Sequence, residues 1–160
     1  MNKSYIGQFC IGAQTASYDM ETEVKDHRDY SYVTEDLIIN TANDFLGEQK
    51  QLPPVFSAKN VNGKRAYEIA RKGNVVGLKL VDIRINKFVI TKIDIPYIDF
   101  SIECTKGTYI RSIARDFGER LGCGAYLTKL RRTQIGNYTV ENALSIEEIE
   151  FLFKIEGNNL

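Results

Sequence analysis

The chain has 160 residues, of which 43% are hydrophobic and 26% are charged, a composition typical of one globular domain. No apolar run approaches the ~20 residues of a membrane-spanning helix, and the N-terminus lacks the apolar core of a signal peptide, so we expect a cytoplasmic protein with no membrane partner. The three cysteines are far apart and His27 is the only histidine, so the sequence predicts neither a disulfide framework nor a metal site.

The formal net charge is zero, but the charges are sorted into blocks along the chain. Residues 19–48 include nine acidic and two basic residues, whereas residues 59–73 include five basic and one acidic. Residues 105–132 include seven basic and two acidic residues, and residues 141–156 are again acidic. A neutral total can therefore hide a basic face suited to nucleic acid, although solvated helices and hairpin lysines would give the same pattern.

The first half of the sequence predicts a strand, a helix and a hairpin, in that order. Residues 3–12 are rich in aromatic and β-branched residues, which favours a strand. Thr34 is a candidate N-cap for an amphipathic helix that ends at Gly47. Two consecutive prolines, Pro53 and Pro54, favour an extended segment, followed by a turn at Asn62 and a short helix over 64–73.

The second half predicts two long strands, a helix, a further strand region and a closing helix. Residues 78–94 and 97–105 suit an antiparallel pair, and the helix over 108–121 places its apolar residues on one face. Residues 125–140 predict one or two strands with a kink at Gly136, and Ser145 with Glu148 forms a capping box for the last helix. The fold class we expect is α+β, with a mostly antiparallel mixed sheet flanked by helices.

The junction of strand and helix at residues 105–111 carries an unusual combination of side chains. Gly107 permits a sharp turn, and Thr108 is a candidate helix cap. Arg111 lies in the first helical turn, away from the apolar stripe, where a guanidinium can hold a carboxylate or phosphate with two hydrogen bonds. The Lys-Gly-Thr sequence lacks the spacing of a P-loop, which argues against nucleotide hydrolysis.

A second stretch, residues 53–73, combines cations with aromatic rings. Such a hairpin and helix suit a folded RNA backbone and its unstacked bases, although an ordinary surface hairpin followed by a helix explains the residues equally well. Its candidate RNA-binding residues are Lys59, Lys64, Arg65, Tyr67 and Arg71.

Three stretches, in this order, resemble the bacterial tRNA pseudouridine-55 synthases: "KSYIGQFCIGAQTASYD", "LPPVFSAKNVNGKRAYEIARKG" and "CTKGTYIRSIARDFGERLGCGAYLTKLRRTQIGNYTVENALS". The resemblance covers residues 3–144. It implies an isomerase of the pseudouridine synthase class that converts a T-loop uridine of tRNA into pseudouridine, with the tRNA T-arm as partner and no metal or organic cofactor.

The resemblance also assigns individual residues. It implies that Tyr5 stacks on the flipped target base and is a candidate for proton transfer, and that Arg111 pairs with a catalytic aspartate. Tyr109 would lie beside Arg111, and Leu130 would pack under the base. Besides the hairpin residues named above, the implied RNA contacts are Lys106, Arg131 and Arg132.

The sequence departs from the family pattern in one important place. The essential aspartate of the family lies in a motif of the form "G.LDP.A.G.L", and none of the nine aspartates here stands in such a motif. We therefore expect residues 1–160 to be a single incomplete catalytic domain, without the aspartate segment and without the family's C-terminal RNA-binding extension, and inactive alone.

A vacant edge of the sheet would then pair with the missing N-terminal segment or with a second copy of the chain. Two alternatives to the enzyme fragment remain. One is a non-catalytic protein that binds tRNA or other RNA with the same fold, and the other is a protein-interaction domain in which the RNA-facing residues are coincidental.

Overall fold

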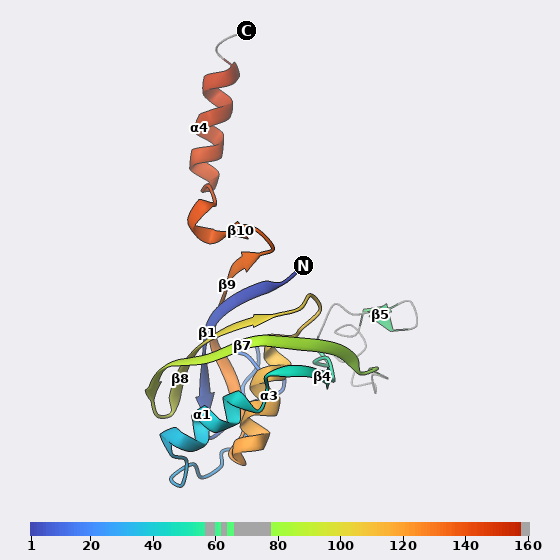
Figure 1. Ribbon diagram of the computed structural model, residues 1–160, viewed down its shortest axis with the longest axis vertical. Helices are drawn as coiled ribbons and strands as arrows, with labels where there is room; N and C mark the ends of the chain where they lie inside the picture. The colour runs from blue at the N-terminus through green and yellow to red at the C-terminus, as the bar shows by residue number, and fades with distance from the viewer. Residues whose placement is uncertain (57–59, 62–63, 66–77, 158–160) are drawn as a thin grey trace.

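The computed structural model describes residues 1–56, 60–61, 64–65 and 78–157 (Figure 1). Its first elements are β1 (Lys3–Ile11), β2 (Gln14–Thr15), β3 (Val24–Lys25), α1 (Glu35–Asn43), β4 (Gly47–Gln51), β5 (Asn60–Val61) and β6 (Lys64–Arg65). They are followed by β7 (Val81–Asp94), β8 (Tyr97–Cys104), α3 (Ile110–Leu121), β9 (Ala125–Ile135), β10 (Tyr138–Thr139) and α4 (Ile146–Gly157).

The main sheet has six strands in the order β10-β9-β1-β8-β7-β4, and every neighbouring pair is antiparallel. β1 lies inside the sheet, between β8 and β9, so the N-terminal strand is held by the C-terminal half of the chain. The predicted pairing of residues 78–94 with 97–105 is confirmed as β7 and β8. The α+β class with a mostly antiparallel sheet is therefore confirmed.

Helices α1 and α3 lie on the same side of the sheet and enclose the core (Figure 1). The centre of this core is aromatic: the ring of Phe9 on β1 stacks on Phe100 at 4.1 Å and on Phe117 of α3 at 5.1 Å between centroids. Phe45 and Phe88 complete the cluster. Burial of such large apolar side chains is the main term that fixes helix and sheet against each other.

Helix α3 buries the predicted stripe of Ile110, Ile113, Ala114, Phe117 and Leu121. It ends at Gly122, whose φ of 84° is left-handed, as is common at helix C-termini. Close contact with β9 depends on Gly118, because a Cβ there would lie 2.0 Å from the backbone nitrogen of Ala125.

The predicted N-cap of α3 is wrong. Tyr109 occupies the cap position and makes no side-chain cap hydrogen bond, and the helix begins at Ile110. The hydroxyl of Thr108 instead donates to the carbonyl oxygen of Thr105 at 2.9 Å, which stabilises the turn before the helix. The local turn therefore takes the hydroxyl that a cap would use.

Helix α1 begins as predicted, because the Thr34 side chain accepts a hydrogen bond from the backbone N–H of Leu37. The helix ends at Asn43, before the predicted stop at Gly47. The chain turns early because Phe45 enters the core, while Leu46 is 47% exposed. Gly47, with φ of 96°, then opens β4.

The remaining expectations concern residues 60–73 and the C-terminal part. The helix predicted over 64–73 is wrong at its start, because Lys64 and Arg65 form strand β6 and Lys64 pairs with Val61 of β5; the hairpin tip at 62–63 and residues 66–73 lie outside the described residues. The strand region over 125–140 is divided at Gly136 into β9 and β10, as predicted. The capping box is also confirmed, since Ser145 and Glu148 each accept the backbone N–H of the other, and α4 projects away from the sheet (Figure 1).

Among the described residues, the structure has no helix that is both long enough and apolar enough to cross a membrane.

Candidate functional site

Arg111 is held in one orientation by contacts from two distant segments. It lies in the first turn of α3, and its guanidinium donates to the carbonyl oxygen of Phe56 at 2.7 Å and to that of Ser17 at 3.4 Å. The same group forms an ion pair with Asp19, with 3.2 Å between Nη1 and Oδ2. Both side chains are about three-quarters buried, at 23% and 28% exposure. Contacts within the chain therefore fix the orientation of the guanidinium.

Asp19 is itself positioned by the loop after β2. Its Oδ1 accepts hydrogen bonds from the buried Ser17 hydroxyl at 2.6 Å and from the backbone N–H of Glu21 at 2.9 Å. Tyr18, just before it, has a φ of 60°, a left-handed conformation that costs an ordinary residue on the order of 1 kcal/mol. The loop therefore holds a strained backbone conformation at Tyr18, next to the carboxylate that pairs with Arg111.

This ion pair corrects one expectation from the sequence. We expected Arg111 to lack a carboxylate partner within the chain, because no aspartate stands in the family's catalytic motif. The structure supplies Asp19 as its partner. The sequence signal that could have found it is the pair of small hydroxyl residues, Thr15 and Ser17, followed by an acid in the loop after a short strand.

A cleft of about 490 Å³ opens beside this ion pair. It brings together two of the predicted site residues, Arg111 and Leu130, although they come from α3 and β9. Leu130 is 46% exposed and offers the cleft an apolar surface. The other lining residues are Asp19, Met20, Glu21, Leu127, Thr128 and Lys129, and of these the sequence interpretation had singled out none.

Tyr5 does not line this cleft. It lies on β1 opposite Ile102 and Arg132, and packs partly buried against the main core. Burial raises the pKa of its hydroxyl, with the nearby Cys104 acting in the same direction, and the adjacent Arg132 guanidinium opposes the shift. The hydroxyl therefore stays protonated at neutral pH, and the cation beside it is Arg132 rather than Arg111.

Tyr109 is fixed through its backbone by Gln51, the last residue of β4. The Gln51 side-chain oxygen accepts the N–H of Tyr109 at 2.8 Å, and its amide nitrogen donates to the Tyr109 carbonyl oxygen at 3.1 Å. Gln51 is 2% exposed, so water cannot replace these bonds. One amide therefore satisfies both backbone groups of the residue that precedes α3.

The next residue extends the same junction. The carbonyl oxygen of Leu52 accepts the hydroxyl of Ser112 at 2.8 Å and the guanidinium of Arg115 at 3.1 Å. Together with the bond from Arg111 to Phe56, these contacts fasten the segment after β4 to the first two turns of α3. The segment that leads into the basic hairpin is thus bonded directly to the helix that carries Arg111.

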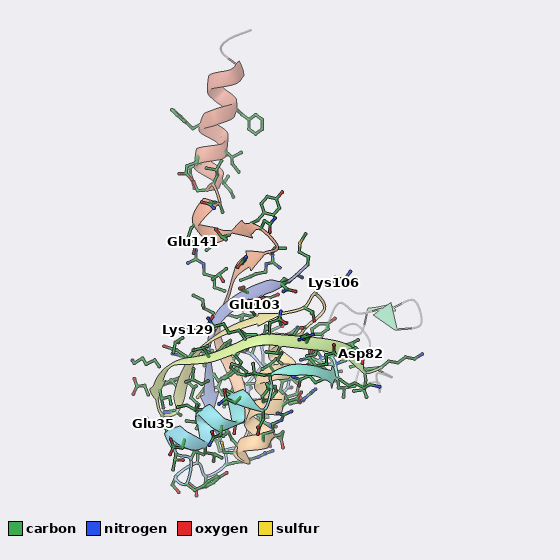
Figure 2. The ribbon with its side chains drawn as sticks, viewed as in Figure 1. Glu35, Asp82, Glu103, Lys106, Lys129 and Glu141 are labelled. Atoms are coloured by element: carbon green, nitrogen blue, oxygen red, sulfur yellow. The ribbon has the colours of Figure 1, made fainter. Side chains whose placement is uncertain are left out.

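The predicted RNA-binding cations that the structure describes come from separate elements of the chain. Lys106, which is labelled in Figure 2, lies in the turn before α3. Arg131 and Arg132 are exposed on β9. Lys59, Tyr67 and Arg71 lie outside the described residues, and of Lys64 and Arg65 only the β6 backbone is described.

Two solved structures contain chains with a similar fold. A Cbf5-Nop10-Gar1 complex contains a chain that matches with a TM-score of 0.68 and 22% identity, over 99% of this chain and 38% of that one. An H/ACA RNP bound to a substrate RNA containing 2'-deoxyuridine matches with a TM-score of 0.65 and 19% identity, over 99% and 37%. The fold is thus one found in chains of these two complexes.

The family is narrower than this fold. Residues 1–110 match the TruB family pseudouridylate synthase N-terminal domain, and residues 111–158 match the tRNA pseudouridylate synthase B C-terminal domain. The chain belongs to the TruB family of pseudouridylate synthases. The boundary between the two matches falls at the start of α3, yet Phe9 and Phe117, one from each range, stack in one core.

Two similar relatives are both named tRNA pseudouridine synthase B. The protein from Flavobacterium johnsoniae is 48% identical over 148 residues, which cover 92% of this chain and 65% of the relative. The protein from Chloroherpeton thalassium is 47% identical over 150 residues, covering 93% and 62%. The chain therefore spans less than two thirds of the length of these relatives.

Proposed function

We propose that the chain is the main part of the catalytic domain of a tRNA pseudouridine synthase, an isomerase that converts a T-loop uridine to pseudouridine in the cytoplasm. Membership of the TruB family and the names of the relatives support this assignment. The observation that carries it is that Arg111 and Leu130 line the same cleft. In the family pattern, the arginine pairs with the catalytic carboxylate and the leucine packs under the target base.

The cleft suits a base that has been taken out of its stack. Flipping costs a few kcal/mol, which contacts with apolar and aromatic surface offset. In our proposal Leu130 packs under the uracil ring, and Tyr5, which lies outside the cleft lining and pairs with Arg132 on the strand that carries Leu130, supplies the aromatic plane and a protonated hydroxyl. Tyr5→Phe separates these two roles, because the ring remains when the hydroxyl is removed.

The chemistry at the sugar requires a carboxylate. Breaking the bond between uracil N1 and the ribose needs a carboxylate as nucleophile or base, with a cation to fix its charge and direction. Arg111 is oriented for this role by Asp19, Ser17 and Phe56. We propose that the reacting aspartate is not one of the nine in this chain, because none stands in the family motif.

Within this proposal, residues 1–160 are one incomplete catalytic domain that does not contain the aspartate motif. Its proposed partners are the tRNA T-arm and a segment that carries the aspartate motif. No metal or organic cofactor enters this proposal, because the reaction needs only the carboxylate, the arginine and the aromatic ring.

Release of tritium from tRNA that contains 5-[³H]-uridine tests the proposal, since the reaction displaces the hydrogen at C5. We expect no release by the chain alone and release when a separately made segment with the aspartate motif is added. Release by the chain alone would show that the carboxylate is already present, and no release in the mixture, with tRNA still bound, would favour a non-catalytic RNA-binding protein.

Arg111→Ala supplies the matched variant. Because its proposed partners are protein groups, we expect loss of turnover in the completed enzyme with tRNA binding nearly unchanged. A large loss of binding would instead place Arg111 on the RNA.

A further inference from the structure

Two arginines on α3, one turn apart, contact neighbouring residues of the loop after β2. Arg111 forms its ion pair with Asp19, and the guanidinium carbon of Arg115 lies over the ring of Tyr18, 5.5 Å from the ring centroid. Residues four apart lie on the same side of a helix, and Tyr18 directly precedes Asp19 in the chain. Arg115 therefore contacts the residue next to the carboxylate that pairs with Arg111.

Arg115 is itself held by hydrogen bonds. Its Nη2 donates to the carbonyl oxygen of Leu52 at 3.1 Å, and its Nε donates to Oδ1 of Asp116 at 2.7 Å. Its side chain is 16% exposed, less than the 23% of Arg111. A cation over an aromatic ring interacts more strongly with that ring when the pair is shielded from water. Arg115 can therefore act as a fixed support for the Tyr18 ring.

Tyr18 needs such a support, because its φ of 60° is strained for a residue that carries a side chain. A conformation of this kind persists only where the surrounding structure holds it. The N–H of Tyr18 donates to the carbonyl oxygen of Thr15 at 3.2 Å, and its own carbonyl oxygen accepts the N–H of Leu127 at 3.0 Å. These bonds hold the backbone from β2 and β9, whereas Arg115 holds the ring from α3.

We propose that Arg115 is a positioning residue, which holds Tyr18 in its left-handed conformation and thereby keeps the Asp19 carboxylate against Arg111. The inference rests on the proposed function, in which Arg111 orients the catalytic aspartate. Arg115 is not among the residues that line the cleft beside Arg111. It therefore acts on the reaction through Tyr18 and Asp19, without touching the substrate.

Steady-state kinetics of the completed enzyme test this role. Arg115→Met keeps an unbranched apolar side chain and removes the guanidinium. Because the variant disturbs the geometry of the reacting groups and leaves the RNA contacts in place, kcat should fall by about tenfold while KM for tRNA stays within about twofold. A change in KM alone, or no change in kcat, would overturn the proposal.

Arg120 on the same helix offers a matched control. Its guanidinium lies over the ring of Phe45, 3.9 Å from the centroid, and donates to the carbonyl oxygen of Asp44 at 3.1 Å. Arg120→Met thus removes the same kinds of contact from α3, away from the loop after β2. It should leave kcat unchanged, and an equal fall of kcat in Arg120→Met and Arg115→Met would show a general effect of weakening the helix.

A double-mutant cycle tests the route through Asp19. Changes that act through the same contact are not additive. Arg115→Met should therefore lower kcat by less than about twofold when Asp19→Ala has already removed the carboxylate, compared with about tenfold when Asp19 is present. Additive losses would show that Arg115 does not act through Asp19.

Two substitutions of Tyr18 test the part assigned to its ring. Tyr18→Phe keeps the ring beneath Arg115, whereas Tyr18→Leu keeps an apolar side chain without a ring. The phenylalanine variant should retain kcat within about twofold, and the leucine variant should lose about as much as Arg115→Met. Equal losses in the two variants of Tyr18 would overturn the role of the ring.

Exchange of backbone amide hydrogens gives a readout that is independent of the reaction, because it uses the chain without tRNA. The N–H of Glu21 donates to Oδ1 of Asp19 at 2.9 Å, and the N–H of Ser31 donates to Oδ1 of Asp29 at 3.0 Å in another loop. Arg115→Met should raise the exchange rate of the Glu21 amide by about fivefold or more and leave that of Ser31 unchanged.

This measurement separates the failure of the positioning role from the failure of the proposed function. If the completed enzyme releases no tritium, the proposed reaction is wrong, but faster exchange at Glu21 in Arg115→Met still supports the hold of Arg115 on the loop. Equal exchange rates at Glu21 in the two proteins would overturn the positioning role, whether or not the enzyme is active.

Discussion

Arg111 and Asp19 form an ion pair across 3.2 Å that joins the first turn of α3 to the loop after β2. The two residues are 92 positions apart in the sequence, and the loop holds the carboxylate with the Ser17 hydroxyl and the Glu21 amide. Because Asp19 already holds the Arg111 guanidinium in place, Arg111 can form a second ion pair with the proposed catalytic aspartate without changing its orientation. Arg111 is therefore a preformed part of the site.

Asp19→Asn should keep the shape of this contact and remove its charge. We expect a loss of about 1–2 kcal/mol in the free energy of unfolding, because a partly buried guanidinium loses its charged partner. Turnover of the completed enzyme should fall by about tenfold or more, since each 1.4 kcal/mol of transition-state stabilisation is tenfold in rate. Urea unfolding and tritium release measure the two effects.

The control for Asp19→Asn is Glu23→Gln, which breaks the exposed pair of Glu23 with Lys25. Surface pairs contribute about 0–1 kcal/mol, so neither stability nor turnover should change noticeably. Equal effects of the two substitutions would show that the pair with Arg111 has no special role.

Gln51→Leu should destabilise the junction between β4 and α3. It leaves the partly buried N–H of Tyr109 without a partner, which costs about 1–3 kcal/mol, whereas the carbonyl oxygen of Tyr109 still accepts the N–H of Ile113 at 3.1 Å. Gln49→Leu, which removes one hydrogen bond to the carbonyl oxygen of Phe45, should cost about 1 kcal/mol. Urea unfolding compares the two variants, and equal losses of unfolding free energy would contradict the assignment.

Tyr126 should make the protein sensitive to alkali. Burial, together with the neighbouring Cys10, raises the pKa of Tyr126 to about 12, from 10.0 when unperturbed. Because the folded pKa is the higher one, the contribution to stability is fully present below pH 10 and is lost as the pH rises from 10 to about 12.

Tyr126→Phe should therefore reduce the loss of unfolding free energy between pH 10 and about 12 by about 2 kcal/mol. Below pH 10, the unfolding free energies of the two proteins should change with pH at the same rate. The three buried cysteines also have raised pKa values, so the comparison between the two proteins, rather than the profile of either, isolates the tyrosine. Parallel profiles through pH 12 would refute this origin of the sensitivity.

Local sequence signals predicted the elements better than their ends. The apolar stripe of α3, the Thr34 cap and the Ser145 capping box each depend on residues within a few turns of one another, and the structure confirms them. The early end of α1 depends on the burial of Phe45 against Phe88 and Phe117, from β7 and α3. Such a tertiary contact overrides the glycine stop and leaves no local trace.

The sequence likewise identified some residues of the site and missed others. Motif likeness pointed to Arg111 and Leu130, which the fold brings to one cleft. It did not identify Asp19 or Gln51, because each acts on a residue that is distant in sequence and only the fold creates the contact. The role assigned to Tyr5 stays a prediction, since its hydroxyl lies beside Arg132.

Arg131 and Arg132 provide the remaining test, because they are described, exposed and carried by the strand that also supplies Leu130. Replacing both with Gln should weaken tRNA binding at low salt and reduce the slope of log K against log salt by about 0.7–0.9 for each phosphate that is no longer neutralised. Lys25→Gln, on the exposed strand β3, should leave the slope unchanged. Filter binding over a range of salt concentrations gives both the tRNA affinity at low salt and the slope of log K against log salt. A slope that is equal in all three proteins would remove these arginines from the RNA surface and shift the expected phosphate contacts to the hairpin after β4.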